Sequence, residues 1–111
     1  MAVLEIRRKL LPPGHPDLAE SLDRIGLLRR RQGRYKEAET AIREALDGAA
    51  ASGETKKEDK DKRIALYTNH LGLVLEDRGK SAEAEAAFRE ALALQIKVLG
   101  AHNRKSRGNG V

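Results

Sequence analysis

The segment Leu22–Leu46, LDRIGLLRRRQGRYKEAETAIREAL, decides the fold of this 111-residue chain. On both sides of Gly33, apolar residues recur at the i, i+3, i+4 and i+7 spacing of one helical face. Ile25 belongs to the stripe before the glycine, and Ala38 and Ile42 belong to the stripe after it. Glycine suits the left-handed position just past a helix end. The segment therefore predicts two antiparallel helices joined by a very short turn.

A second copy of this segment occupies Leu66–Leu92, LYTNHLGLVLEDRGKSAEAEAAFREAL. Aligning Gly26 with Gly72 keeps both helices and the turn in register. The alignment also pairs Ile25 with Leu71, Gly33 with Gly79, Ala38 with Ala84, Ile42 with Phe88, Ala45 with Ala91 and Leu46 with Leu92. Repeats of about 34 to 47 residues built from paired helices indicate a helical solenoid.

Both copies share one pattern: a small residue, a turn glycine, and then Ala, a large apolar residue and Ala. This pattern resembles the tetratricopeptide repeat (TPR). The linker Leu11-Pro12-Pro13-Gly14-His15-Pro16-Asp17 resembles that of kinesin-light-chain-type repeats, and Lys97–Asn103 begins the same linker and then departs from it. The resemblance covers residues 1 to about 100. It implies an all-α, right-handed α-solenoid of about two helix-turn-helix repeats plus one leading helix.

The expected domain organisation follows from these two copies. A TPR domain spans 1–100, and a basic tail without periodicity, 101–111, is predicted to be disordered. Within the domain we expect a leading or capping helix at 2–11, repeat 1 at 16–47, a connecting loop at 48–55 and repeat 2 at 56–99.

Composition and charge exclude several classes of protein. The chain lacks cysteine, which removes disulfides and thiolate chemistry. Its net charge of +5 comes from basic residues near both ends, whereas a nucleic-acid module usually carries its basic patch on the fold itself. No apolar run approaches the length of a membrane span, and nothing resembles a signal peptide. We therefore expect a cytoplasmic protein that binds neither nucleic acid nor membrane.

No group of residues predicts catalysis, a cofactor or a metal. His15, His70 and His102 lack metal-ligand spacing, and His70 is expected to be a polar residue in a groove or in packing. Two sets of glutamates, predicted to lie on solvated helix faces with i,i+4 pairing, are Glu37, Glu39 and Glu44, and Glu83, Glu85 and Glu90. The sequence therefore predicts a protein that is not an enzyme.

The TPR resemblance implies a scaffold that binds a partner peptide or helix along the concave side of the solenoid, which the first helix of each repeat lines. In those two helices one stripe repeats at i, i+3, i+7, i+10 and i+11. The predicted partner-binding residues are Glu20, Asp23, Leu27, Arg30 and Arg31 in repeat 1, and Leu66, Asn69, Leu73, Glu76 and Asp77 in repeat 2. We expect exposed leucines to give apolar contact, Asn69 a hydrogen bond, and Arg30 and Asp77 complementary charge. An apolar patch rimmed by charge is typical of a contact site.

An alternative function is self-association. The last helix carries more apolar residues than one neighbour would cover, and Leu92, Ile96 and Leu99 are the predicted contact residues. Solenoids generally need three or more repeats with polar caps. The exposed end is therefore expected to pack on a further repeat, a second copy of the chain, or a swapped helix.

Overall fold

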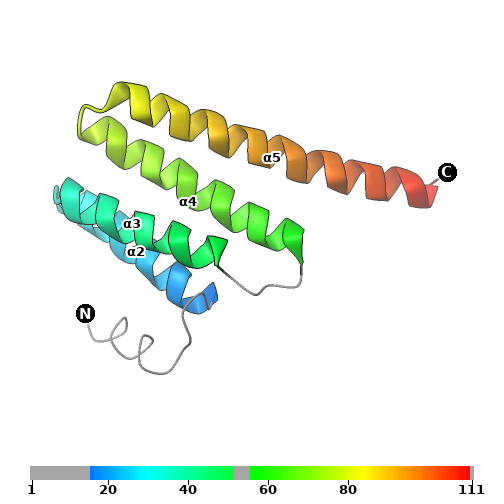
Figure 1. Ribbon diagram of the computed structural model, residues 1–111, viewed down its shortest axis with the longest axis horizontal. Helices are drawn as coiled ribbons and strands as arrows, with labels where there is room; N and C mark the ends of the chain where they lie inside the picture. The colour runs from blue at the N-terminus through cyan, green and yellow to red at the C-terminus, as the bar shows by residue number, and fades with distance from the viewer. Residues whose placement is uncertain (1–15, 52–55, 111) are drawn as a thin grey trace.

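Four α-helices make up the described part of the chain, residues 16–51 and 56–110 of a computed structural model (Figure 1). The helices are α2 (Pro16–Arg31), α3 (Tyr35–Ala50), α4 (Lys57–Asp77) and α5 (Ser81–Gly110). Helices α2 and α3 form one antiparallel pair, and α4 and α5 form the second pair. The second pair continues the first, because α4 packs on α3. The predicted leading helix at 2–11 lies outside the described residues.

The two turns have the same backbone geometry. Gly33 and Gly79 both have φ of 76°, the left-handed region that glycine enters without steric cost. In each turn the residue after the glycine donates a backbone hydrogen bond of 2.9 Å back into the preceding helix, from Arg34 to Arg29 and from Lys80 to Leu75. This pattern is that of a helix ended by glycine, and it confirms the prediction from the aligned glycines.

The core follows the repeat alignment as well. One buried cluster joins α3, α4 and α5, and the other joins α2, α3 and α4. The first contains Ala38, Ile42, Leu71, Val74, Leu75, Ala84 and Ala87, and the second contains Ala19, Leu22, Ala45, Ala49 and Tyr67. Alanines at these positions let the helix axes approach closely, so a core with few aromatic residues is close-packed.

Each helix pair is held by a matching close contact between a glycine and a large side chain. A Cβ atom added to Gly26 would overlap the buried side chain of Ile42, and one added to Gly72 would lie 2.6 Å from Cε1 of Phe88. Ile42 and Phe88 occupy equivalent positions in the two repeats. The second helix of each pair therefore packs directly on the backbone of the first.

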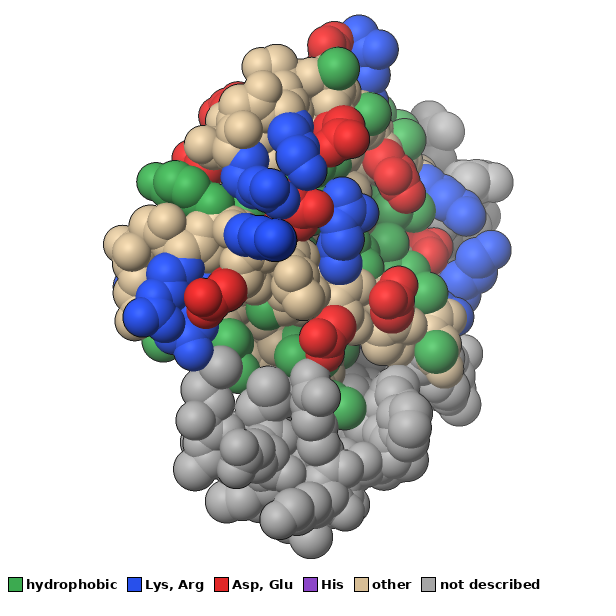
Figure 2. All heavy atoms as spheres, turned by 60° about the vertical axis from the view of Figure 1, so that its left-hand side comes forward, with side chains coloured by type: hydrophobic (Ala, Val, Ile, Leu, Met, Phe, Trp, Pro, Cys, Tyr) green, Lys and Arg blue, Asp and Glu red, His purple; other side chains and the backbone are tan. Residues whose placement is uncertain are grey.

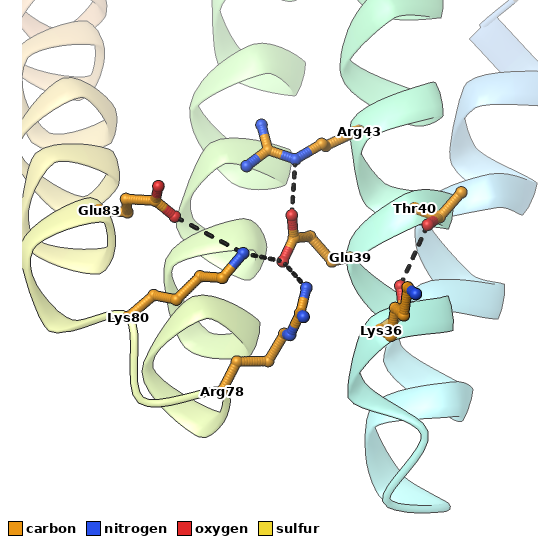
Figure 3. Close-up of polar contacts among 7 residues, drawn as sticks. All are labelled: Lys36, Glu39, Thr40, Arg43, Arg78, Lys80 and Glu83. Carbon is orange, nitrogen blue, oxygen red and sulfur yellow. Dashed lines mark hydrogen bonds and ion pairs between the residues drawn. The ribbon is translucent and has the colours of Figure 1, made fainter.

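A buried carboxylate connects α3 to the α4–α5 turn (Figure 3). Glu39 accepts hydrogen bonds from Arg43 at 2.9 Å and from Arg78 at 2.7 Å, and Lys80 lies 3.6 Å away. The predicted i,i+4 pairing is present between Glu39 and Arg43. The prediction that Glu39 lies on a solvated face is wrong, because its side chain is 11% exposed. The partners from the second repeat compensate for the lost hydration of the carboxylate.

Burial alone would raise the pKa of Glu39. The hydrogen bonds from Arg43 and Arg78, together with the positive charges of Arg43 and Lys80, outweigh burial and lower the pKa below its usual value. Glu39 is therefore ionised, and its ion pairs with Arg78 and Lys80 connect the two repeats.

Two predicted boundaries need correction. Helix α3 continues to Ala50, so the connection starts later than the predicted loop at 48–55. Helix α5 is helical to Gly110, whereas disorder was predicted from residue 101. Residues 101–107 contain no proline and several good helix formers, so they lack a stop signal that would end the helix. In Figure 1, α5 extends well past the beginning of α4.

Candidate functional site

The candidate site is the face shared by α2 and α4, the first helices of the two repeats. The two helices run in the same direction (Figure 1). Two side-chain pairs connect them, Asp23 with His70 and Arg30 with Asp77. Within each helix the two paired residues are two turns apart, Asp23 and Arg30 in α2, and His70 and Asp77 in α4. Both pairs therefore lie along one line, here called the seam. This seam fixes how the two stripes predicted from the sequence lie relative to each other.

Asp23 is buried in this seam. Nδ1 of His70 lies 2.9 Å from each carboxylate oxygen of Asp23, and both side chains are largely covered. An ionised carboxylate can only accept, so this bond requires the tautomer of His70 that carries a hydrogen on Nδ1. Asp23 was predicted to contact a partner; the structure places it instead under the surface as a link between α2 and α4. His70 was predicted to be a polar residue in a groove or in packing, and the structure shows the packing role.

Arg30 and Asp77 also meet each other. Nε of Arg30 donates to a carboxylate oxygen of Asp77, although each was expected to offer its charge to a partner. Their charges largely cancel at the seam. Arg31, the next residue, is exposed.

Apolar and amide side chains lie beside the seam. Leu66 is 49% exposed, whereas Leu27, Leu73 and Asn69 are half-buried. Sequence reasoning expected all three leucines to be exposed; Leu27 and Leu73 are partly covered. Leu66 is therefore the most exposed of the three predicted leucines.

The carboxylates of the predicted stripe differ in their surroundings. Glu20 is bonded to Arg24 at 2.6 Å within α2, and Glu76 is exposed near the end of α4. Glu76 also lines a cavity of about 360 Å³ that Phe88 and Leu92 of α5 help to form. The α2–α4 face is thus continuous with the end of the second helix pair.

Tyr67 lies in the buried core behind the seam. It is almost completely buried among α2, α3 and α4, and burial raises the pKa of its phenol. A hydrogen bond to Arg63 opposes the rise, and the negative charges of Asp23 and Glu20 add to it. The phenol of Tyr67 is therefore neutral at pH 7.

The end of the molecule that carries both turns has mixed charge. Figure 2 shows Lys and Arg side chains gathered there around Asp and Glu side chains. The ion pairs at this end include Arg29 with Glu37 at 3.4 Å and Arg78 with Glu39 at 2.7 Å. The cations are distributed among carboxylates, so they do not form a uniform basic surface.

The apolar residues predicted for self-association all lie on α5. Leu92 is 56% exposed, and Ile96 and Leu99 are each 60% exposed. Their i, i+4, i+7 spacing places them on one face of α5. The structure therefore brings these three together, as the sequence predicted, on a helix face that no described helix covers.

Comparison with known protein families gives two matches to the described repeats. Residues 1–51 match one family model and residues 64–104 match a second, both described as tetratricopeptide repeat. The chain belongs to the tetratricopeptide repeat family. Its repeats are of the kinesin-light-chain type, and its fold is the helical solenoid of helix-turn-helix repeats. No curated protein matches the chain.

TPR repeats are non-catalytic modules for protein–protein interaction, so the predicted class of function is supported at that level. Within residues 16–51 and 56–110, no helix is both long and apolar enough to cross a bilayer. Nor does the described part of this TPR chain bring together three or more His, Asp or Glu side chains that could hold a metal ion.

Proposed function

We propose that the α2–α4 face binds a segment of a partner protein. The observation that supports this is an exposed apolar residue, Leu66, beside half-buried Leu73 and Asn69, next to a seam whose charges are already paired. A partner side chain that covers Leu66 removes apolar surface from water at roughly 25 cal/mol per Å². The amide of Asn69 can donate to and accept from a partner backbone.

The charge pairing in the seam supports one kind of partner. Arg30 and Asp77 neutralise each other, so the charges left to a partner are those of Arg31 and Glu76 at the exposed margins. We infer a partner segment with an apolar centre and polar flanks. Its affinity comes from the centre, since exposed charges at the rim of an interface contribute little.

Peptides selected from a displayed random library on the wild-type chain test this proposal. The dissociation constant of each peptide is measured for a face variant, Leu66→Asp with Asn69→Ala, and for a matched variant, Leu92→Asp with Ile96→Asp. We expect the face variant to bind the peptides at least about tenfold more weakly than the wild type, because it removes a central apolar contact and an amide. Equal affinity of both variants for every selected peptide would refute the proposal.

A second candidate function is self-association through α5. Leu92, Ile96 and Leu99 are each more than half exposed on one helix face, the most exposed large apolar side chains that the structure describes. A second copy of the chain that covered this stripe would remove a contiguous apolar patch from water. Sedimentation velocity at several concentrations tests it: the wild type should associate, and Leu92→Asp with Ile96→Asp should remain monomeric. A wild type that is monomeric at every concentration removes this function.

A further inference from the structure

A groove separates α3 from α5 on the side of the molecule away from the α2–α4 face. No Cα atom of the described part of α3 lies within 8 Å of one in α5, and α4 lies between the two helices (Figure 1). The space between them is a cavity of about 530 Å³ with walls from α3 and α5 and a floor from α4. This volume admits individual side chains of a ligand, not a complete helix.

The floor of the α3–α5 groove is apolar except for one hydroxyl group. Ile64 and Leu71 of α4 line it together with Leu46 of α3 and Ala87 of α5. Thr68 lies between these leucine and isoleucine positions and is only 3% exposed. Its hydroxyl makes no hydrogen bond to any residue that the structure describes. A buried hydroxyl without a partner is unfavourable, so a ligand atom that bonds to it would gain free energy.

The walls of the groove carry carboxylates from both repeats. Asp47 of α3 and Glu90 of α5 line the cavity, are exposed, and form no ion pair within the described part of the chain. The cations nearest the groove are already engaged, since Arg43 bonds to Glu39, and Lys80 lies 3.9 Å from Glu83 (Figure 3). That cluster lies beside the α4–α5 turn (Figure 3). The charges on the groove walls that no described partner compensates are therefore the carboxylates of Asp47 and Glu90.

We propose that the α3–α5 groove binds a basic amphipathic helix of a partner protein, with a Lys or Arg side chain inserted between Asp47 and Glu90. The methylenes of the inserted side chain contact Ile64 and Leu46, as long basic side chains do on apolar surface. The cationic head meets the two carboxylates, and its N–H groups donate to the Thr68 hydroxyl oxygen. Apolar residues one helical turn away on the same partner face cover the rest of the floor.

The carboxylates of the groove attract a basic helix, whereas the net charge of the whole chain repels it. The chain has a net charge of +5, so a basic peptide is repelled by the molecule as a whole. Binding of such a peptide would have to come from the acidic groove. This surface is distinct from the α2–α4 face and uses none of its residues.

The test uses a fluorescein-labelled synthetic helix of Leu, Ala and Lys, with Lys at i and i+4, and a second helix in which Glu replaces every Lys. Fluorescence anisotropy gives the dissociation constants for the whole chain. We expect Asp47→Asn with Glu90→Gln to weaken binding of the Lys helix about tenfold, the effect of losing two ion pairs. The matched variant, Asp59→Asn with Glu85→Gln, changes the net charge equally outside the groove and should alter binding less than about twofold.

Thr68→Val provides an independent readout. Because the hydroxyl has no partner within the described chain, replacing it by a methyl group should leave the free energy of unfolding unchanged or raised. Binding of the Lys helix should nevertheless weaken. The proposal is overturned if the Lys helix does not bind the wild type, if the Glu helix binds as well, or if the matched variant weakens binding as much as the groove variant. It is also overturned if Thr68→Val binds as the wild type does.

Discussion

His70 of the second repeat and Asp23 of the first form a largely buried bond, with Nδ1 of His70 2.9 Å from both carboxylate oxygens. The bond orients α2 and α4 side by side, and it places Leu66 and Asn69 on the face proposed for partner binding. Asp23, which was predicted to contact a partner, thus packs beneath this face together with His70.

Asp23→Ala should lower the free energy of unfolding by about 1–3 kcal/mol, because it leaves the Nδ1–H of His70 without its acceptor in a covered position. Urea denaturation monitored by circular dichroism measures this. The control is Arg24→Ala, which removes an exposed ion pair with Glu20 and should cost less than about 1 kcal/mol. If the two variants are equally stable, the Asp23–His70 bond does not hold the repeats together.

Gly72→Ala should destabilise the second helix pair by about 1–3 kcal/mol, because the new Cβ would lie 2.6 Å from Phe88. The better helix propensity of alanine offsets only part of this cost. Thermal unfolding of Gly72→Ala with and without Phe88→Leu measures the coupling. The smaller leucine side chain should restore much of the stability that Gly72→Ala loses. Additive effects of the two substitutions on stability would argue against direct contact between the two positions.

The depressed pKa of Glu39 predicts a specific dependence of stability on pH. A carboxyl whose pKa is lower in the folded than in the unfolded state stabilises the fold above the unfolded value, and this stability disappears as pH falls through the folded pKa. Glu39→Gln should therefore be less stable than the wild type at pH 7, and the difference should shrink as acid protonates Glu39 in the wild type.

Urea denaturation at a series of pH values from 7 downward checks this behaviour. Glu85→Gln is the control, since Glu85 is exposed and pairs with Arg89 in its own helix. A stability difference between Glu39→Gln and wild type that is independent of pH would contradict the assigned role.

Tyr67 should ionise only above pH 10.0, its unperturbed pKa, because burial raises the pKa of its phenol. In a Tyr35→Phe variant Tyr67 is the only tyrosine, so the tyrosinate absorbance at alkaline pH reports on it alone. A group whose pKa is raised on folding stabilises the fold below its unfolded pKa and loses that stability as pH rises through the folded value. A titration midpoint at or below 10.0 while the chain remains helical would place Tyr67 outside the core.

The elements that depend on local pattern were predictable from the sequence. The pairing of Ala38 with Ala84 and of Gly33 with Gly79 in the alignment predicted buried alanines and left-handed turns, and both are present. These features repeat because each helix pair must bury the same face in the same way. The exposed stripe of Leu92, Ile96 and Leu99 followed from periodicity for the same reason.

Contacts between helices distant in the sequence could not be predicted this way. Helical periodicity assigns Asp23 and Arg30 to a face but does not say which residues of α4 lie opposite them. Glu39 was placed on a solvated face because its i,i+4 partner Arg43 explained it locally, whereas Arg78 arrives from the next repeat. The α3–α5 groove depends likewise on the spacing of two helices that α4 separates.

The central claim is that α2 and α4 stack to form one wall that binds a partner. NMR spectra of the isotope-labelled chain, recorded with and without a peptide selected on the wild type, test it most directly. We predict that the largest shift changes fall on the Leu66 and Leu73 methyl groups and the Asn69 side-chain amide. Shift changes confined to α3 and α5, with these three side chains unaffected, would contradict the account.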